Sequence, residues 1–179
     1  ITINAEGDGI KSTNDTDTAK GYISISGGTF DITAGADGIQ AETTVYISGG
    51  EFTITTGGGS VNASYGSNQG GIWGMWSSSS SSDTDQTAKA LKAADQVVID
   101  GGTFTIDSSD DAVHSNNSIT INGGTMDISS GDDGMHADTL LTINNGTITI
   151  NQSYEGLESA SIVINGGTLW VVSSDDGLN

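Results

Sequence analysis

Short segments in which apolar side chains alternate with polar ones recur along this chain. They flank a series of Gly-Gly or Asn-Gly dipeptides. The segments before each dipeptide are residues 23–25, 45–47, 97–99, 119–121, 141–143 and 162–164, and those after it are residues 30–32, 52–54, 104–106, 126–128, 148–150 and 169–171. Alternation with a period of two among β-branched and aromatic residues predicts half-buried strands.

The dipeptides are regularly spaced. They begin at residues 27, 49, 101, 123, 145 and 166, so successive dipeptides lie 22, 52, 22, 22 and 21 residues apart. The one long interval equals a period of 22 plus an insertion of about 30 residues. A repeat of this length is typical of solenoid proteins.

A third short segment follows in each repeat, centred on one apolar residue. These residues are Ile10, Ile39, Leu91, Val113, Met135, Leu157 and Leu178, and we expect Val61 to take the same place just before the long insertion. Three short strands per repeat, separated by glycine-rich corners, predict a parallel β-helix of roughly seven coils. The absence of proline fits this fold, because neighbouring coils need nearly every backbone N–H.

The length of 179 residues predicts one domain, residues 1–179, with surface insertions at about 11–21 and 62–89. The second insertion carries Trp73, Trp76 and a serine run, for which we expect a flexible surface loop. The two tryptophans either pack against the wall of the solenoid or offer flat aromatic faces to sugar rings.

Stacking the coils aligns acidic residues into two columns just before the third segment. One column reads Asp8, Asp37, Lys89, Asp111, Asp133, Glu155 and Asp176, with Gly58 or Gly59 in the interrupted coil, and the preceding column includes Asp110, Asp132, Tyr154 and Asp175. Unit charges about 4.8 Å apart repel by roughly 1 kcal/mol in water and by more near a protein surface. Calcium takes six to eight oxygen ligands and would relieve this repulsion. We therefore predict more than one bound Ca²⁺, and the alternative is solvated surface charge.

Two histidines follow the aspartate pairs by three residues. His114 and His136 share a column with Lys92 and Glu158, and the alternation places this column on the same outer surface as the aspartates. The histidines are either metal ligands, which would suit a transition metal such as zinc, or neutral side chains that contact sugar. We favour the second reading.

Charge narrows the choice of partners. The chain carries four lysines, no arginine and 23 acidic residues, which gives a formal net charge of −19. Nucleic acid and anionic membrane surfaces are therefore not expected partners, because both attract positively charged proteins. No apolar run is long enough to insert into a membrane as a helix, and without cysteine there are no disulfides or thiolate metal sites.

The phrases INGGTMDISSGDDGMHAD, QSYEGLES and SSDDGLN, in this order and spacing, resemble a family of secreted bacterial carbohydrate-binding β-helix proteins related in fold to the polysaccharide lyases. The resemblance covers essentially the whole chain. It implies a right-handed, single-stranded parallel β-helix, bound calcium, an extracellular or cell-surface location, and affinity for cellulose or acidic pectin. The matching positions are Asp110, Asp111, Asp132, Asp133, Glu155, Glu158, Asp175 and Asp176.

Three functions remain open at this stage. We favour a non-catalytic binding protein, in which Ca²⁺ bridges pectin carboxylates to the acidic face or aromatic residues such as Trp73, Trp76 and Tyr154 bind neutral glucans. A pectate lyase acting by calcium-assisted β-elimination would need a base such as Lys89, for which relief of acidic repulsion is the favoured role. A structural solenoid could instead stack end to end into a filament through exposed strands.

Overall fold

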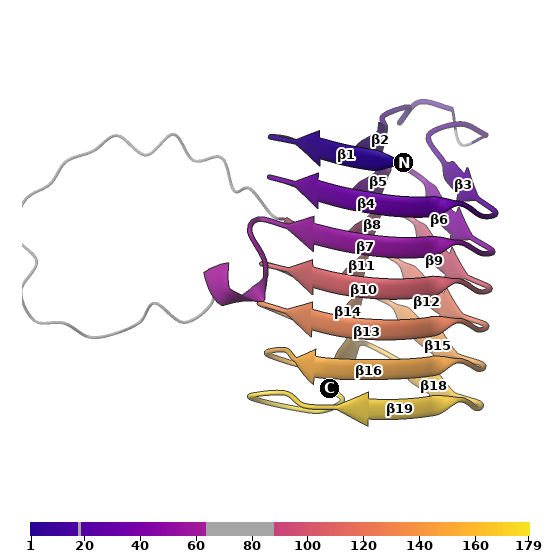
Figure 1. The fold of residues 1–179 in the computed structure, drawn as a ribbon. Helices are drawn as coiled ribbons and strands as arrows, with labels where there is room; N and C mark the ends of the chain where they lie inside the picture. Colours follow the sequence, from indigo (N-terminus) through magenta and orange to yellow (C-terminus); the bar gives the residue numbers. More distant parts are fainter. Residues whose placement is uncertain (18, 64–87) are drawn as a thin grey trace, which may run out of the picture.

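The computed structural model describes residues 1–17, 19–63 and 88–179, and these form a parallel β-helix (Figure 1). Sheet 1 contains seven parallel strands, in the order β1 (Thr2–Ala5), β4 (Thr29–Ala34), β7 (Glu51–Thr56), β10 (Thr103–Ser108), β13 (Thr125–Ser130), β16 (Thr147–Gln152) and β19 (Thr168–Val171). Sheet 2 contains β2 (Ile10–Ser12), β5 (Ile39–Ala41), β8 (Leu91–Ala93), β11 (Val113–Ser115), β14 (Met135–Ala137) and β17 (Leu157–Ser159). Sheet 3 contains β3 (Ile23–Ile25), β6 (Thr44–Ile47), β9 (Gln96–Ile99), β12 (Ser118–Ile121), β15 (Leu140–Ile143) and β18 (Ile162–Ile164).

This arrangement confirms the predicted fold class. Each coil contributes one strand to sheet 1, and equivalent residues of successive coils lie opposite each other, as Phe52 and Phe104 do. Leu178 also takes its expected place through a parallel bridge to Leu157. The part of the chain that the structure describes has no helix long and apolar enough to span a membrane.

The Gly-Gly and Asn-Gly dipeptides turn the chain from sheet 3 into sheet 1. At Gly50 the backbone φ is 124°, a conformation that residues with a side chain rarely adopt. A Cβ atom there would also lie 3.1 Å from the carbonyl oxygen of Gly28 in the preceding coil. The dihedral angle therefore requires glycine, and the close approach of the coils adds a tight contact for any side chain.

Alternate strand residues point inward and form one apolar core along the axis. Ile54, Leu91 and Ile99 have no exposed surface. Phe30, Phe52 and Phe104 stack in successive coils of sheet 1, with ring centroids 4.8 and 4.7 Å apart and nearly parallel planes. This spacing matches the distance between neighbouring strands, so the backbone ladder sets the ring stack.

The long insertion lies within one coil. β5 pairs directly with β8, with Ile39 opposite Leu91, so Leu91 fills the third apolar position of the interrupted coil. Val61 instead belongs to the short 3-10 helix η1 (Ser60–Asn62) and is 85% exposed. The prediction for Val61 is therefore wrong, because Val61 is an apolar residue of the insertion and not of a strand in the repeat.

The bounds of the insertions also shift slightly. β2 extends to Ser12, so the first insertion starts after that residue. Ala88 and Lys89 are buried within the stack, so the second insertion ends before them. Lys89, and not Gly58 or Gly59, occupies the acidic column in the interrupted coil. Trp73 and Trp76 lie outside the described residues.

Candidate functional site

The turns that connect sheet 1 to sheet 2 carry a carboxylate column, which we define as Asp8, Asp37, Asp111, Asp133 and Glu155. The four aspartates each accept a hydrogen bond from a backbone N–H of the next coil. Glu155, the fifth member, donates its own backbone N–H to Asp133. Asp8 Oδ1 accepts from the N–H of Asp37 at 3.0 Å, and Asp37 Oδ1 accepts from that of Lys89 at 2.9 Å. Asp111 and Asp133 accept from the next coil at 3.1 Å each. The column therefore ties successive coils together.

The carboxylate column is largely buried, which differs from the sequence expectation. Asp37, Asp111 and Asp133 are 3%, 2% and 4% exposed, although we expected them to face the outer surface. The turn folds each carboxylate against the next coil, where a backbone N–H replaces its water. Hydrogen bonds from N–H groups stabilise a buried carboxylate, so these aspartates have a structural role that the repeat pattern does not reveal.

Lysines neutralise the N-terminal part of the column. Lys11 pairs with Asp8 at 2.7 Å and Lys92 pairs with Asp37 at 3.0 Å. Lys89 lies 2.8 Å from both Asp110 and Asp111. Repulsion between the stacked carboxylates is thus relieved in part by side chains of the protein itself.

Asp111 and Lys89 form the most buried of these pairs. Burial opposes ionisation of Asp111, but hydrogen bonds and charge from His114 and Lys89 lower its pKa to about 2. Burial likewise opposes the charge of Lys89, yet Asp111 and Asp110 raise its pKa above the ordinary value. Lys89 is therefore held as an ammonium ion, which does not suit the proton-abstracting base that a lyase needs.

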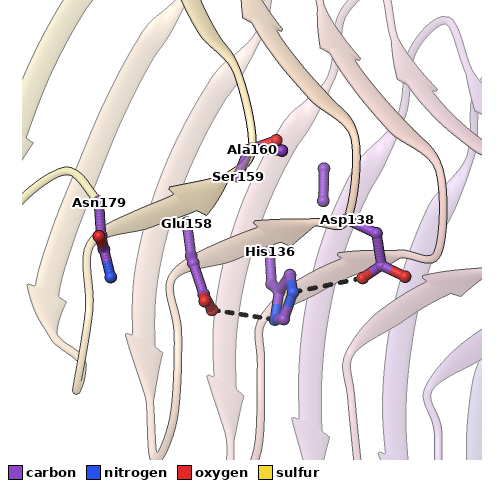
Figure 2. Close-up of a pocket in the computed structure, with 7 residues that line it drawn as sticks. His136, Asp138, Glu158, Ser159, Ala160 and Asn179 are labelled. Carbon is purple, nitrogen blue, oxygen red and sulfur yellow. Dashed lines mark ion pairs between the residues drawn. The ribbon is translucent and has the colours of Figure 1, made fainter.

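The C-terminal coils present an acidic hollow of about 250 Å³. It is lined by Asp132, Asp133, His136, Tyr154, Glu155 and Glu158. A second hollow of about 370 Å³ adjoins it along β14 and β17 and shares His136 and Glu158 with it (Figure 2). The structure thus brings six of the predicted metal and carbohydrate residues to one place.

His136 lies between carboxylates of two coils. Its Nδ1 is 3.4 Å from Asp133 Oδ2. Figure 2 shows its two other contacts, from Nδ1 to Glu158 Oε2 at 3.2 Å and from Nε2 to Asp138 Oδ1 at 3.4 Å. Interaction with Asp133 outweighs burial and raises the pKa of His136 to about 9. Interaction with Asp133, together with burial, raises the pKa of Glu158 to about 7. Negative charge therefore exceeds positive charge in this hollow.

His114 occupies the same column one coil earlier, in a different setting. Its Nδ1 is 2.8 Å from Asp111 Oδ2 and its Nε2 is 2.9 Å from Asn116 Oδ1, so both ring nitrogens make hydrogen bonds. The two imidazole rings meet edge to face, with centroids 5.0 Å apart.

Within residues 1–17, 19–63 and 88–179, three groups of side chains bring potential metal-ligand atoms within 4.8 Å of one another: Asp110 with Asp111 and Asp132; Asp111 with His114 and His136; and Asp133 with His136 and Glu158. Asp8 and Asp37 belong to none of these groups, and each pairs with a lysine instead. Asp175 and Asp176 are exposed and also lie outside these groups. The possible ligands thus concentrate where the lysine pairs end.

Asp132 carries a charge that its surroundings oppose. Burial and the charges of Asp133, Asp111 and Asp110 raise its pKa from 3.8 to about 7. A carboxylate with a raised pKa destabilises the fold as the pH rises toward that value, because the unfolded chain ionises more readily. A cation beside Asp132 would remove this penalty.

We expect Asp132→Asn to stabilise the metal-free protein by about 1 kcal/mol at about pH 8, because it removes the repelled charge. The gain should vanish at about pH 3, where Asp132 is protonated in the native protein and largely protonated in the unfolded chain. Urea unfolding in the presence of a chelator measures both values. A variant less stable than the wild type at pH 8 would contradict the unfavourable environment of Asp132.

Comparison with known proteins identifies one family. A family described as carbohydrate-binding domain-containing protein matches residues 1–134 and again residues 132–177. Neither the curated proteins nor the solved structures contain a significant match. The matched residues include the carboxylate column and the acidic hollow. Because the match extends over most of its length, the chain belongs to the family of carbohydrate-binding domain-containing proteins.

Proposed function

We propose that this chain is a secreted, non-catalytic protein that binds plant cell-wall polysaccharide in a calcium-dependent manner. Membership of the family supports carbohydrate binding. The observation that carries the proposed calcium dependence is the group formed by Asp110, Asp111 and Asp132, whose carboxylate oxygens lie within 4.8 Å of one another.

The chemistry of this group fits calcium. All three side chains offer oxygen, which is the ligand that Ca²⁺ prefers, and water can complete its shell. Lys89 supplies one positive charge against three carboxylates. The oxygens of Asp111 are already engaged by Lys89, His114 and the N–H of Asp133. Oδ1 of Asp110 is engaged by Lys89 and the N–H of Asp111, so Oδ2 of Asp110 and the carboxylate of Asp132 would be the principal ligands.

Calcium also offers a means of binding an acidic polysaccharide. A protein with a net charge of −19 repels polygalacturonate, so a cation must lie between the carboxylates of the two partners. The hollow of about 370 Å³ beside the acidic hollow is open to solvent and has room for a sugar residue. Polygalacturonate is therefore the favoured ligand, with Tyr154 and His136 as sugar contacts.

The test is binding of the metal-free chain to immobilised polygalacturonate, with and without added Ca²⁺. We expect a chelator to weaken binding at least about 10-fold, because removal of a bridging charge leaves like charges facing each other. Cellulose serves as the neutral comparison, and its binding should not change. Undiminished binding to polygalacturonate in chelator would contradict calcium bridging.

Asp132→Asn should reproduce the effect of the chelator in the presence of Ca²⁺. The matched control is Asp31→Asn, which removes the same charge from the exposed outer side of β4. We expect the control to bind like the wild type. Equal loss in both variants would mean that overall charge, and not a local calcium site, governs binding.

A further inference from the structure

The acidic hollow contains an imidazole nitrogen as well as carboxylate oxygens, which calcium alone does not explain. We propose that Asp133, His136 and Glu158 form a second cation site, with Glu155 lining the same hollow, and that it is built for a first-row transition-metal dication such as Zn²⁺. This site is separate from the calcium position at Asp110 and Asp132, and it does not depend on the proposed function.

The spacing of the donor atoms supports this assignment. His136 Nδ1 lies 3.4 Å from Asp133 Oδ2 and 3.2 Å from Glu158 Oε2. A charged hydrogen bond between such groups is usually about 2.7–2.9 Å long. Two ligands of a tetrahedral metal, each at about 2.0–2.1 Å, lie about 3.3–3.4 Å apart. The separations of Nδ1 from the Asp133 and Glu158 carboxylates are therefore compatible with ligands that share one ion.

The other ring nitrogen of His136 already faces a carboxylate. Its Nε2 lies 3.4 Å from Asp138 Oδ1, on the side of the ring away from Glu158 (Figure 2). A metal-bound histidine commonly directs its second N–H to a carboxylate, which fixes the tautomer and the orientation of the ring. Asp138 is placed to do this, so a metal ion that displaces the Nδ1 proton would bind the lone pair that faces the hollow.

Glu155 provides an independent observation. The residue is 8% exposed and lines the same hollow, and among the described residues its Oε2 is buried with no hydrogen-bond partner. Its Oε1 accepts a hydrogen bond from Asn179 at 2.7 Å, which holds the carboxylate in place. A buried carboxylate oxygen without a partner is costly, and a cation bound in the same hollow would offset that cost.

The donor set also determines the type of metal. Calcium and magnesium prefer shells made only of oxygen, whereas imidazole together with carboxylate suits zinc and its neighbours. His114, one coil earlier, does not offer the same site, because hydrogen bonds to Asp111 and Asn116 occupy both of its ring nitrogens. His136 is therefore the proposed ligand, and His114 is its matched control.

The experiment titrates the metal-free full chain with Co²⁺, followed by its visible absorption, and then displaces Co²⁺ with Zn²⁺. We expect one equivalent to bind, with Zn²⁺ competing and Ca²⁺ failing to displace it at equal concentration. His136→Gln should weaken Co²⁺ binding by at least about 10-fold, whereas His114→Gln should change it by less than about 3-fold. Equal effects of the two substitutions, or displacement by Ca²⁺, would overturn the proposal.

Nuclear magnetic resonance of the wild-type protein tests the same point without a variant. The chain has two histidines, so only two imidazole signals need to be followed. We expect Zn²⁺ to shift the His136 signal strongly and the His114 signal little. If neither signal moves, His136 is only an internal counter-ion for the carboxylates and the proposal is wrong.

The two proposals fail separately. Asp132→Asn is expected to impair calcium-dependent binding of polygalacturonate and to leave Co²⁺ absorption in place, whereas the readout for His136→Gln is Co²⁺ absorption alone, because His136 is also a proposed sugar contact. Loss of calcium-dependent binding with intact Co²⁺ absorption would therefore affect only the calcium position.

Discussion

Asp111→Ala is expected to lower the free energy of unfolding by about 3–5 kcal/mol, the range for removing one partner of a buried ion pair. Asp111 is 2% exposed and contacts Lys89 and His114 through Oδ2, while Oδ1 accepts the N–H of Asp133. The substitution would leave that N–H and part of the charge of Lys89 without a partner. Urea unfolding at neutral pH measures the loss.

The control is Asp31→Ala, which removes an exposed aspartate of sheet 1 and should change stability by about 0.5 kcal/mol or less.

The pH dependence of stability offers a further check on Asp111. The lowered pKa of Asp111, about 2, means that its charge stabilises the fold above its ordinary value of 3.8 and loses this effect as the pH falls toward 2. The difference between the wild type and Asp111→Asn should therefore shrink between about pH 4 and pH 2. A constant difference would contradict the role of its charge.

Phe52→Ala is expected to destabilise the protein by about 3–5 kcal/mol, the usual range for truncating a buried phenylalanine. Phe52 is 2% exposed and stacks between Phe30 and Phe104 at 4.8 and 4.7 Å. Its removal would open a cavity in the middle of the stack and end both ring contacts. Urea unfolding followed by circular dichroism would measure the change.

Phe52→Met is the matched control for this substitution. The same ladder of sheet 1 already contains Met126, which lies opposite Phe104 in the next coil. Methionine fills most of the volume of phenylalanine and adapts its shape, so a loss below about 1.5 kcal/mol is expected. If the alanine and methionine variants were equally stable, packing of the Phe52 side chain would not be the source of the stability lost in Phe52→Ala.

The partners of the carboxylate column change along the axis. Lysines form ion pairs with Asp8, Asp37 and Asp111, and histidines contact Asp111 and Asp133. Glu155 instead accepts a hydrogen bond from the side-chain amide of Asn179. Positive charge from the protein therefore declines toward the C-terminal coils, where the acidic hollow lies. Divalent cations at that end would continue the neutralisation that lysine begins at the other.

Much of this architecture could be predicted because a solenoid makes distant residues neighbours in a regular way. Residues 22 positions apart face each other across adjacent coils, so the repeat alone placed His114 opposite His136 and Phe104 opposite Met126. The same regularity predicted the acidic columns. It failed at Val61, where the insertion interrupts the count and periodicity cannot tell an apolar residue of a loop from one of a strand.

The sequence by itself determined the fold class, the strands, the inward residues and the vertical order of the charged side chains, because each depends on periodicity along the chain. Only the tertiary structure decided that Asp111 turns toward the N–H of the next coil, that Lys89 joins it, and that His114 is fully hydrogen-bonded while His136 faces an acidic hollow. These differences arise from side-chain direction and from the neighbours one coil away. Two residues of the same type in one column can therefore differ in chemistry, because the side chains around them differ from coil to coil.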